Sequence, residues 1–115
     1  MITTHVLATA SGRPAAAVPV RLERLDADTP GVTSWSIAGA GVTDADGRLR
    51  TLTPPGPVTP GTYRLCFDTG SYFAVRGVEG FFPVVEIQFV IRDGAAHHHV
   101  PLLLSPYGYS TYRGS

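Results

Sequence analysis

Glycine and proline interrupt this sequence so often that long helices are excluded. The chain has 13 Gly and 10 Pro in 115 residues. Residues 54–61 alone hold four Pro and two Gly, so this segment can be neither a strand nor a helix interior. Between the interruptions, apolar and polar residues alternate in short runs, which is the pattern of half-buried strands. These features exclude a helical bundle and a coiled coil and favour an all-β fold.

The alternating runs predict about seven or eight strands, a number that fits a two-sheet β-sandwich of this length. We expect strands at residues 2–8, 18–25, 33–42, 48–52, 62–67, 85–92 and 97–105, with one more in the tail from residue 107. Residues 71–78 are the one plausible helix, and it is short. The sequence has no internal repeat, so we expect a single domain over residues 1–115.

Charge and composition argue against several kinds of partner. Nine Arg balance nine acidic residues, which leaves no basic surface typical of nucleic-acid or anionic-membrane binding. No apolar run approaches the ~20 residues of a membrane span, and the first residues lack the basic region of a leader peptide. Cys66, the single cysteine, cannot form an internal disulfide, and we expect a buried, unreactive thiol. The sequence therefore predicts a cytoplasmic protein.

Three consecutive histidines are the most conspicuous polar feature. If residues 97–105 form a strand, His97 and His99 share one face and His98 lies on the other. A His-x-His pair can bind a metal ion given a third ligand, and the nearest carboxylate is Asp93. A solvated strand end explains the same pattern. His5 lies in the first predicted strand, where an isolated histidine is usually structural.

The C-terminal tail has an unusual composition for a chain end. Residues 105–115 contain three Tyr, with Ser, Thr and Arg around them. Chain termini normally fray, whereas Tyr and Arg are enriched where proteins bind other molecules. This composition indicates a segment that is held against a partner surface.

Residues 101–115 resemble the C-terminal signature of the 5-hydroxyisourate hydrolases, transthyretin-like enzymes of purine catabolism. Residues 5–15 are similar to the N-terminal signature of that family, and residues 43–48 to its middle turn. The terminal Tyr-Arg-Gly-Ser is the specific part, because it separates the hydrolases from the transthyretin hormone carriers. One departure is Ala8, where the family usually has Asp.

The resemblance implies a transthyretin-like two-sheet β-sandwich with one short helix, which needs neither cofactor nor metal. It also implies a homotetramer, a dimer of dimers with active sites at the dimer–dimer interface. The family's catalytic positions fall on His5, Arg48 and His99. Its substrate-binding positions fall on His5 and Arg48 again and on the tail residues Ser110, Tyr112, Arg113, Gly114 and Ser115. His97 and His98 match no required position and are interpreted as strand-end residues.

The implied reaction is hydrolytic opening of the six-membered ring of 5-hydroxyisourate to a ureido-imidazoline carboxylate. Histidine suits proton transfer near neutral pH, so His5 and His99 are expected to flank the attacking water, one of them as general base. Arg48 is expected to bind the developing oxyanion, and Tyr112 to hold the flat ring. Three alternatives remain at this point: a small-ligand carrier without hydrolase activity, a non-catalytic interaction domain, and a metal-dependent hydrolase that uses the histidine cluster.

Overall fold

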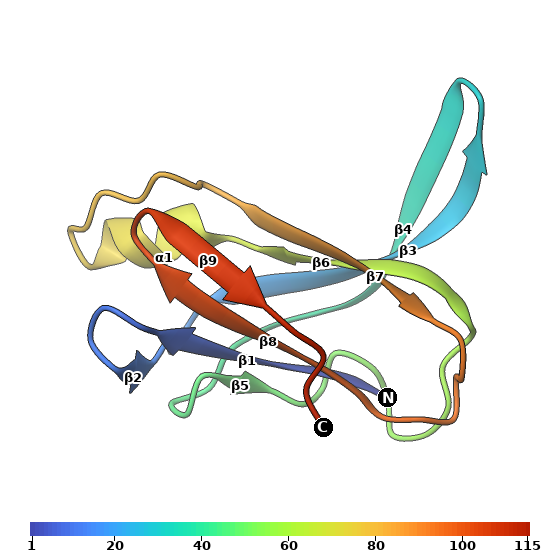
Figure 1. The fold of residues 1–115 in the computed structure, drawn as a ribbon, viewed down its shortest axis with the longest axis horizontal. Coiled ribbons are helices and arrows are strands. Elements are labelled where there is room, and N and C mark those ends of the chain that lie inside the picture. Colours follow the sequence, from blue (N-terminus) through green and yellow to red (C-terminus); the bar gives the residue numbers. More distant parts are fainter.

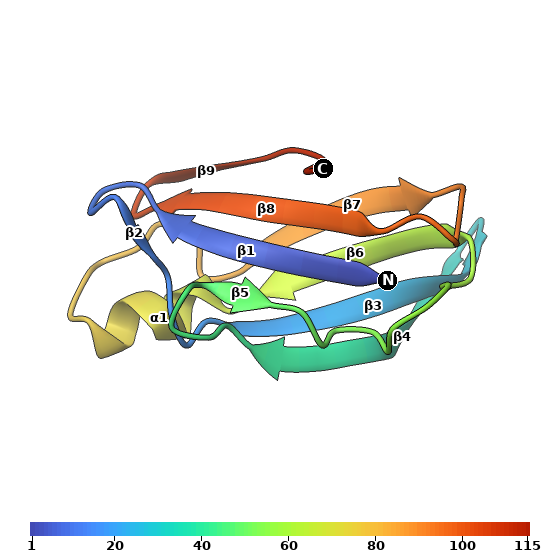
Figure 2. The same ribbon diagram turned by 90° about the horizontal axis from the view of Figure 1, so that it is seen from below.

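The computed structural model describes all 115 residues as two stacked β-sheets with one short helix (Figures 1 and 2). The first sheet has the order β2–β1–β8–β9, with β5 also paired to β1. Its strands are β1 (Ile2–Ala8), β2 (Arg13–Pro14), β5 (Arg48–Leu49), β8 (His98–Ser105) and β9 (Gly108–Thr111). The second sheet has the order β4–β3–β6–β7. Its strands are β3 (Pro19–Thr29), β4 (Val32–Val42), β6 (Gly61–Phe67) and β7 (Val85–Ile91).

The core lies between the two sheets and confirms the alternation that predicted them. Each strand directs every second side chain inward, and these side chains form a single cluster of 19 buried hydrophobic residues. Phe67, Leu22 and Leu65 contribute from the second sheet, and Val6 and Leu102 from the first. The expected all-β sandwich is therefore confirmed. No helix in the structure has the length and hydropathy needed to cross a lipid bilayer.

The helix begins and ends earlier than predicted. It is α1 (Thr69–Val75) rather than residues 71–78. The carboxylate of Asp68 caps its start by accepting a hydrogen bond from the backbone N–H of Ser71 at 3.1 Å. The backbone of Gly77, at φ 66°, is in the left-handed region that commonly ends helices. Residues 76–78 therefore leave the helix.

Strand β5 and the hairpin of β3 and β4 also differ from the prediction. Strand β5 stops at Leu49, although residues 50–52 were expected to continue it. Strand β3 continues to Thr29, and β4 begins at Val32. Together they form a hairpin that projects from the sandwich (Figure 1). The projecting part packs against no core. Its two strands are therefore held together by backbone hydrogen bonds. Because neither face is buried, the sequence here need not alternate between apolar and polar residues, and the alternation that predicts a strand is weak.

Cys66 lies on the outward side of β6, where it is buried as expected. Its Sγ is 3.6 Å from a carboxylate oxygen of Glu23 and 3.7 Å from one of Glu86. Burial, together with these two negative charges, raises the pKa of the Cys66 thiol to about 11. The prediction of an unreactive thiol agrees with this environment.

Candidate active site

Strand pairing in the first sheet brings His5, Arg48 and His99 to one face. Strand β5 runs antiparallel to β1 and places Arg48 opposite His5. Strand β8 runs parallel to β1 and places His99 opposite Thr3. Paired residues share a face of the sheet, as do residues two apart on one strand. All three side chains therefore project from the outward face of the first sheet.

The turn before β5 positions Arg48 and orients His5. The carboxylate of Asp44 accepts hydrogen bonds from the backbone N–H groups of Arg48 at 3.0 Å and Asp46 at 2.9 Å. The bond from Arg48 is the main reason that the pKa of Asp44 lies below its ordinary value. The carbonyl oxygen of Asp46 lies 2.8 Å from Nε2 of His5. A carbonyl can only accept, so Nε2 of His5 carries a hydrogen and its neutral ring has the lone pair on Nδ1.

His99 is held by a hydroxyl from β1. Its Nδ1 is 2.8 Å from the Oγ1 of Thr3, and the same Oγ1 is 2.7 Å from Nε2 of His97. Thr3 is only 4% exposed although it lies on the outward face. Partial burial lowers the pKa of His99 below its ordinary value, and the charge of Arg48 lowers it further, with smaller effects from His97 and His5. A pKa below the ordinary value favours the neutral ring of His99 at pH 7.

Thr3, Arg48 and His99 line a cavity of about 220 Å³ on the outward face of the first sheet, whereas His5 is not among its lining residues. Its lining residues are Met1, Thr3, Thr4, Arg48, Arg50, His97, His99 and Ser115. All but one of them are polar or charged, which suits a small polar molecule that carries carbonyl or anionic oxygens. The N- and C-termini lie at the same end of the sheet in both ribbon views, and both chain ends contribute to this cavity (Figures 1 and 2).

The tail reaches the cavity through a contact between Gly114 and His99. The N–H of Gly114 donates to the carbonyl oxygen of His99 at 2.7 Å. A Cβ atom at position 114 would lie 2.7 Å from Cδ2 of His99, closer than such atoms approach. Only glycine fits this position, and the close approach brings Ser115 to the cavity beside Arg48 and His99.

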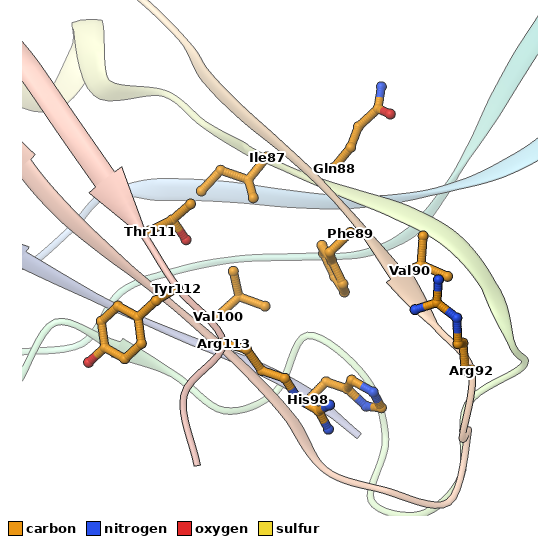
Figure 3. Close-up of a pocket in the computed structure, with 10 residues that line it drawn as sticks. All are labelled: Ile87, Gln88, Phe89, Val90, Arg92, His98, Val100, Thr111, Tyr112 and Arg113. Atoms are coloured by element: carbon orange, nitrogen blue, oxygen red, sulfur yellow. The ribbon is translucent and has the colours of Figure 1, made fainter.

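The remaining tail residues do not reach this cavity within one chain. Tyr112 and Arg113 line a different cavity, of about 350 Å³, where β7 of the second sheet faces β8 of the first. Figure 3 shows the hydroxyl of Tyr112 directed away from Phe89, and the side chain of Arg113 beside His98. Ser110 is exposed on β9, opposite Leu103. The expected substrate-binding residues are thus divided between the two cavities, and Ser110 and His5 line neither of them.

His97 is an exposed residue directly before the start of β8, in agreement with its interpretation as a strand-end residue, and its side chain also lines the cavity. Its ring bonds to Thr3 and lines the same cavity as His99. His98 differs: it is buried on the inward side, where its Nδ1–H donates to the carbonyl oxygen of Ala96 at 3.0 Å. The sequence offered one signal that His97 lies near the predicted site. His97 is two residues from His99, and Thr3 is two residues from His5, and residues two apart on a strand share a face.

The His-x-His pair has no third ligand of a usual kind beside it. No group of three or more His, Cys, Asp or Glu side chains comes together in a way that could hold a metal ion. Between the rings of His97 and His99 lies instead the hydroxyl of Thr3. The donor set therefore does not match a tetrahedral zinc site, which favours the interpretation of the pair as proton donors and acceptors.

Ala8, the departure from the family pattern, ends β1 before a turn. Its carbonyl oxygen accepts hydrogen bonds from the N–H of Gly12 at 2.9 Å and from the hydroxyl of Ser11 at 3.3 Å. The turn is thus held by the backbone of residue 8, and the small side chain packs against the core.

Comparison with known proteins agrees with this geometry over nearly the whole chain. The model of the HIUase/Transthyretin family matches residues 2–114. The 5-hydroxyisourate hydrolase of Mus musculus is 48% identical over 114 residues, which are 99% of this chain and 94% of that protein. The structure of Klebsiella pneumoniae 5-hydroxyisourate hydrolase superposes with a TM-score of 0.80 at 39% identity, over 99% of this chain and 92% of the other. Sea bream transthyretin in complex with thyroxine gives a TM-score of 0.88 at 32% identity, over 98% and 93%. With its two-sheet fold and a match from end to end, this chain belongs to the HIUase/Transthyretin family.

Proposed function

We propose that this protein is a 5-hydroxyisourate hydrolase, which opens the six-membered ring of its substrate to a ureido-imidazoline carboxylate. The observation that carries the proposal is the polar cavity in which the neutral ring of His99, the guanidinium of Arg48 and the chain terminus at Ser115 meet. Full-length similarity to proteins named as this hydrolase supports the assignment.

The residues of the cavity can carry out each step of the hydrolysis. A neutral His99 accepts a proton from water, and the hydroxide adds to the ring carbonyl carbon. Arg48 stabilises the negative charge that develops on the carbonyl oxygen. The C–N bond of the ring then breaks, and the protonated His99 returns its proton to the leaving nitrogen. His5 borders this site through its pairing with Arg48. Chemistry of this kind needs neither a cofactor nor a metal ion.

The proposal includes a homotetramer whose active sites lie between dimers. Its support is the outward face of the first sheet, which carries both the polar cavity and the half-buried Leu7 and Leu103. Ser110 and Tyr112 are exposed in one chain, and a second copy placed on this face would enclose them. Light scattering coupled to size exclusion tests this, with an expected mass four times the 12.2 kDa of one chain. The cytoplasmic location stays a prediction from the sequence.

A carrier of small ligands is the second candidate, because the thyroxine-bound sea bream transthyretin has the same fold. The cavity argues against it, since two arginines and two histidines are a poor surface for an apolar ligand. A UV assay that follows the decay of freshly generated 5-hydroxyisourate separates the two functions. A hydrolase accelerates the decay in proportion to protein concentration, before and after treatment with a chelator. Tight thyroxine binding without accelerated decay would identify a carrier, and activity lost to the chelator would point to a metal-dependent enzyme.

A further inference from the structure

The hydroxyl of Thr3 bonds to two histidine rings and has one hydrogen to give. Its Oγ1 lies 2.7 Å from Nε2 of His97 and 2.8 Å from Nδ1 of His99. A hydroxyl donates one hydrogen bond and can accept two. Because the two rings are the only partners of Thr3 Oγ1 in the structure, its hydrogen goes to one ring and the oxygen accepts from the N–H of the other. The two possible directions place the proton of neutral His99 on different nitrogens. The direction of the two hydrogen bonds at Thr3 therefore decides whether His99 can act as a base toward the cavity.

In the first direction, His97 donates to Thr3 and Thr3 donates to Nδ1 of His99. The neutral His99 then carries its proton on Nε2 and has no lone pair free. In the second direction, Nδ1–H of His99 donates to Thr3, and Thr3 donates to Nε2 of His97. The neutral His99 then has a lone pair on Nε2, the one ring nitrogen without a hydrogen-bond partner in the chain.

The charges around the cavity favour the second direction. The guanidinium groups of Arg48 and Arg50 belong to residues that line it with His99. Nδ1 of His99 is occupied by Thr3 in either direction, so Nε2 is the nitrogen left to interact with these groups. A guanidinium favours a lone pair on a neighbouring nitrogen over an N–H, which presents positive charge. His5 does not compete for this nitrogen, because its Nε2–H already donates to the carbonyl oxygen of Asp46.

We infer that Thr3 and His97 are positioning residues that hold neutral His99 with its proton on Nδ1 and its lone pair on Nε2. The role of His99 as the base rests on the proposed function, whereas the hydrogen-bond direction does not. His97 acts through Thr3: by accepting the hydroxyl hydrogen, it makes the Thr3 oxygen a better acceptor for Nδ1–H of His99. When His99 takes a proton from water, this bond stabilises the resulting imidazolium. Neither positioning residue needs to touch the substrate.

The direct test is the protonation state of the histidine rings in the wild-type protein. Long-range ¹⁵N–¹H correlation spectra of the histidine-labelled protein distinguish a ring protonated on Nδ1 from one protonated on Nε2. Recorded about two pH units above the ordinary histidine pKa of ~6.5, they report neutral rings. We expect His99 and His97 protonated on Nδ1, and His5 protonated on Nε2. A proton on Nε2 of His99 overturns the inference whether or not the protein hydrolyses 5-hydroxyisourate.

Paired variants test the contribution of each positioning residue. His97→Gln keeps an oxygen that can accept from Thr3, whereas His97→Leu has no acceptor. We expect His97→Leu to lower kcat about tenfold with KM within about twofold, the effect of one neutral hydrogen bond. In its spectrum the proton of His99 should move toward Nε2. His97→Gln should recover most of the kcat and keep the Nδ1 proton. Equal losses of kcat in both variants would contradict the inference that His97 acts on His99 through Thr3. A proton that stays on Nδ1 of His99 in His97→Leu would contradict it as well.

The same comparison at Thr3 uses Ser to retain the hydroxyl and Val to remove it at nearly constant volume. Thr3→Val should lower kcat at least as much as His97→Leu, and Thr3→Ser should recover most of it. Thr9→Val is the matched control, because Thr9 also lies at the β1–β8 pair and its hydroxyl donates to the carbonyl oxygen of Leu104, away from the cavity. If wild-type protein has no hydrolase activity, the proposed function fails, and the spectra still decide the hydrogen-bond direction.

Discussion

Gly114 and His99 form an isolated antiparallel bridge in which the Gly114 N–H donates to the His99 carbonyl oxygen at 2.7 Å. This bridge is the point where the C-terminal tail joins the cavity beside His99, the proposed base. It makes the last residues of the chain part of the site, although terminal residues ordinarily have little effect on a folded domain.

Adding one methyl group at the bridge should disrupt the site without unfolding the protein. In Gly114→Ala, the new Cβ would meet Cδ2 of His99 at 2.7 Å, so either the tail or the ring must move. We expect kcat/KM for 5-hydroxyisourate to fall about 10- to 100-fold, as a displaced catalytic group costs, with a Tm near that of wild type. Gly108→Ala is the control, since its Cβ meets only the Ser105 hydroxyl at 3.7 Å. Similar losses in both variants would contradict this role of the bridge.

Removing the imidazole of His99 should abolish most of the turnover. His99→Asn deletes the proposed base at a half-buried position on the outward face, outside the core. We expect kcat to fall by about 10²–10⁴-fold, the usual contribution of general acid–base catalysis. Circular dichroism should report an unchanged β-sandwich. Near-normal decay of fresh 5-hydroxyisourate with this variant would remove His99 from the mechanism.

The pH dependence of kcat/KM should extend below the ordinary histidine range. The base must be neutral, and burial together with Arg48 lowers the pKa of His99. Activity should therefore persist as the pH falls and decline only below about 6.5, the unperturbed value. In Arg48→Gln the positive charge is lost, so the pKa of His99 should rise and the acidic limb should move to higher pH, in addition to a lower rate. If the acidic limb of the pH profile stays in place in Arg48→Gln, a group other than His99 controls it.

Deleting residues 112–115 should abolish turnover and leave the sandwich folded. The deletion removes both Ser115 from the cavity and the Gly114 bridge to His99, but no residue of the buried core. We expect no acceleration of 5-hydroxyisourate decay and a far-UV spectrum like that of wild type. Should the shortened protein keep most of its activity, the tail has no part in catalysis, and the carrier function gains support.

The thiol of Cys66 should resist alkylation in the folded protein. Its pKa of about 11 leaves little thiolate at pH 8, because burial and the carboxylates of Glu23 and Glu86 disfavour the charge. We expect iodoacetamide to react about 10²-fold more slowly than with a free cysteine, or slower still. Mass spectrometry measures the rate, and the denatured protein provides the control. Rapid labelling under native conditions would show that the thiol is accessible and ionised.

The sequence by itself determined the sandwich and three of the residues that line the polar cavity. Alternation predicted β1 as residues 2–8, its observed bounds, because one face of this strand packs in the core. The resemblance to the hydrolases identified Arg48, His99 and Ser115, which do line one cavity. The predicted strand bounds were less accurate where the side chains do not pack in the core, as in the outer part of the β3–β4 hairpin.

The tertiary structure decided which of these residues meet. Alternation states which face of a strand a residue occupies, but it says nothing of which strands are neighbours. The parallel pairing of β1 with β8 places Thr3 beside His99 and allows its hydroxyl to bond to His97 as well. The same packing turns Tyr112 and Arg113 toward a different cavity. Hydrogen bonds between residues far apart in the chain form only once the sheet has assembled, so the spacing of His97 from His99 indicated a shared face but not their common contact with Thr3.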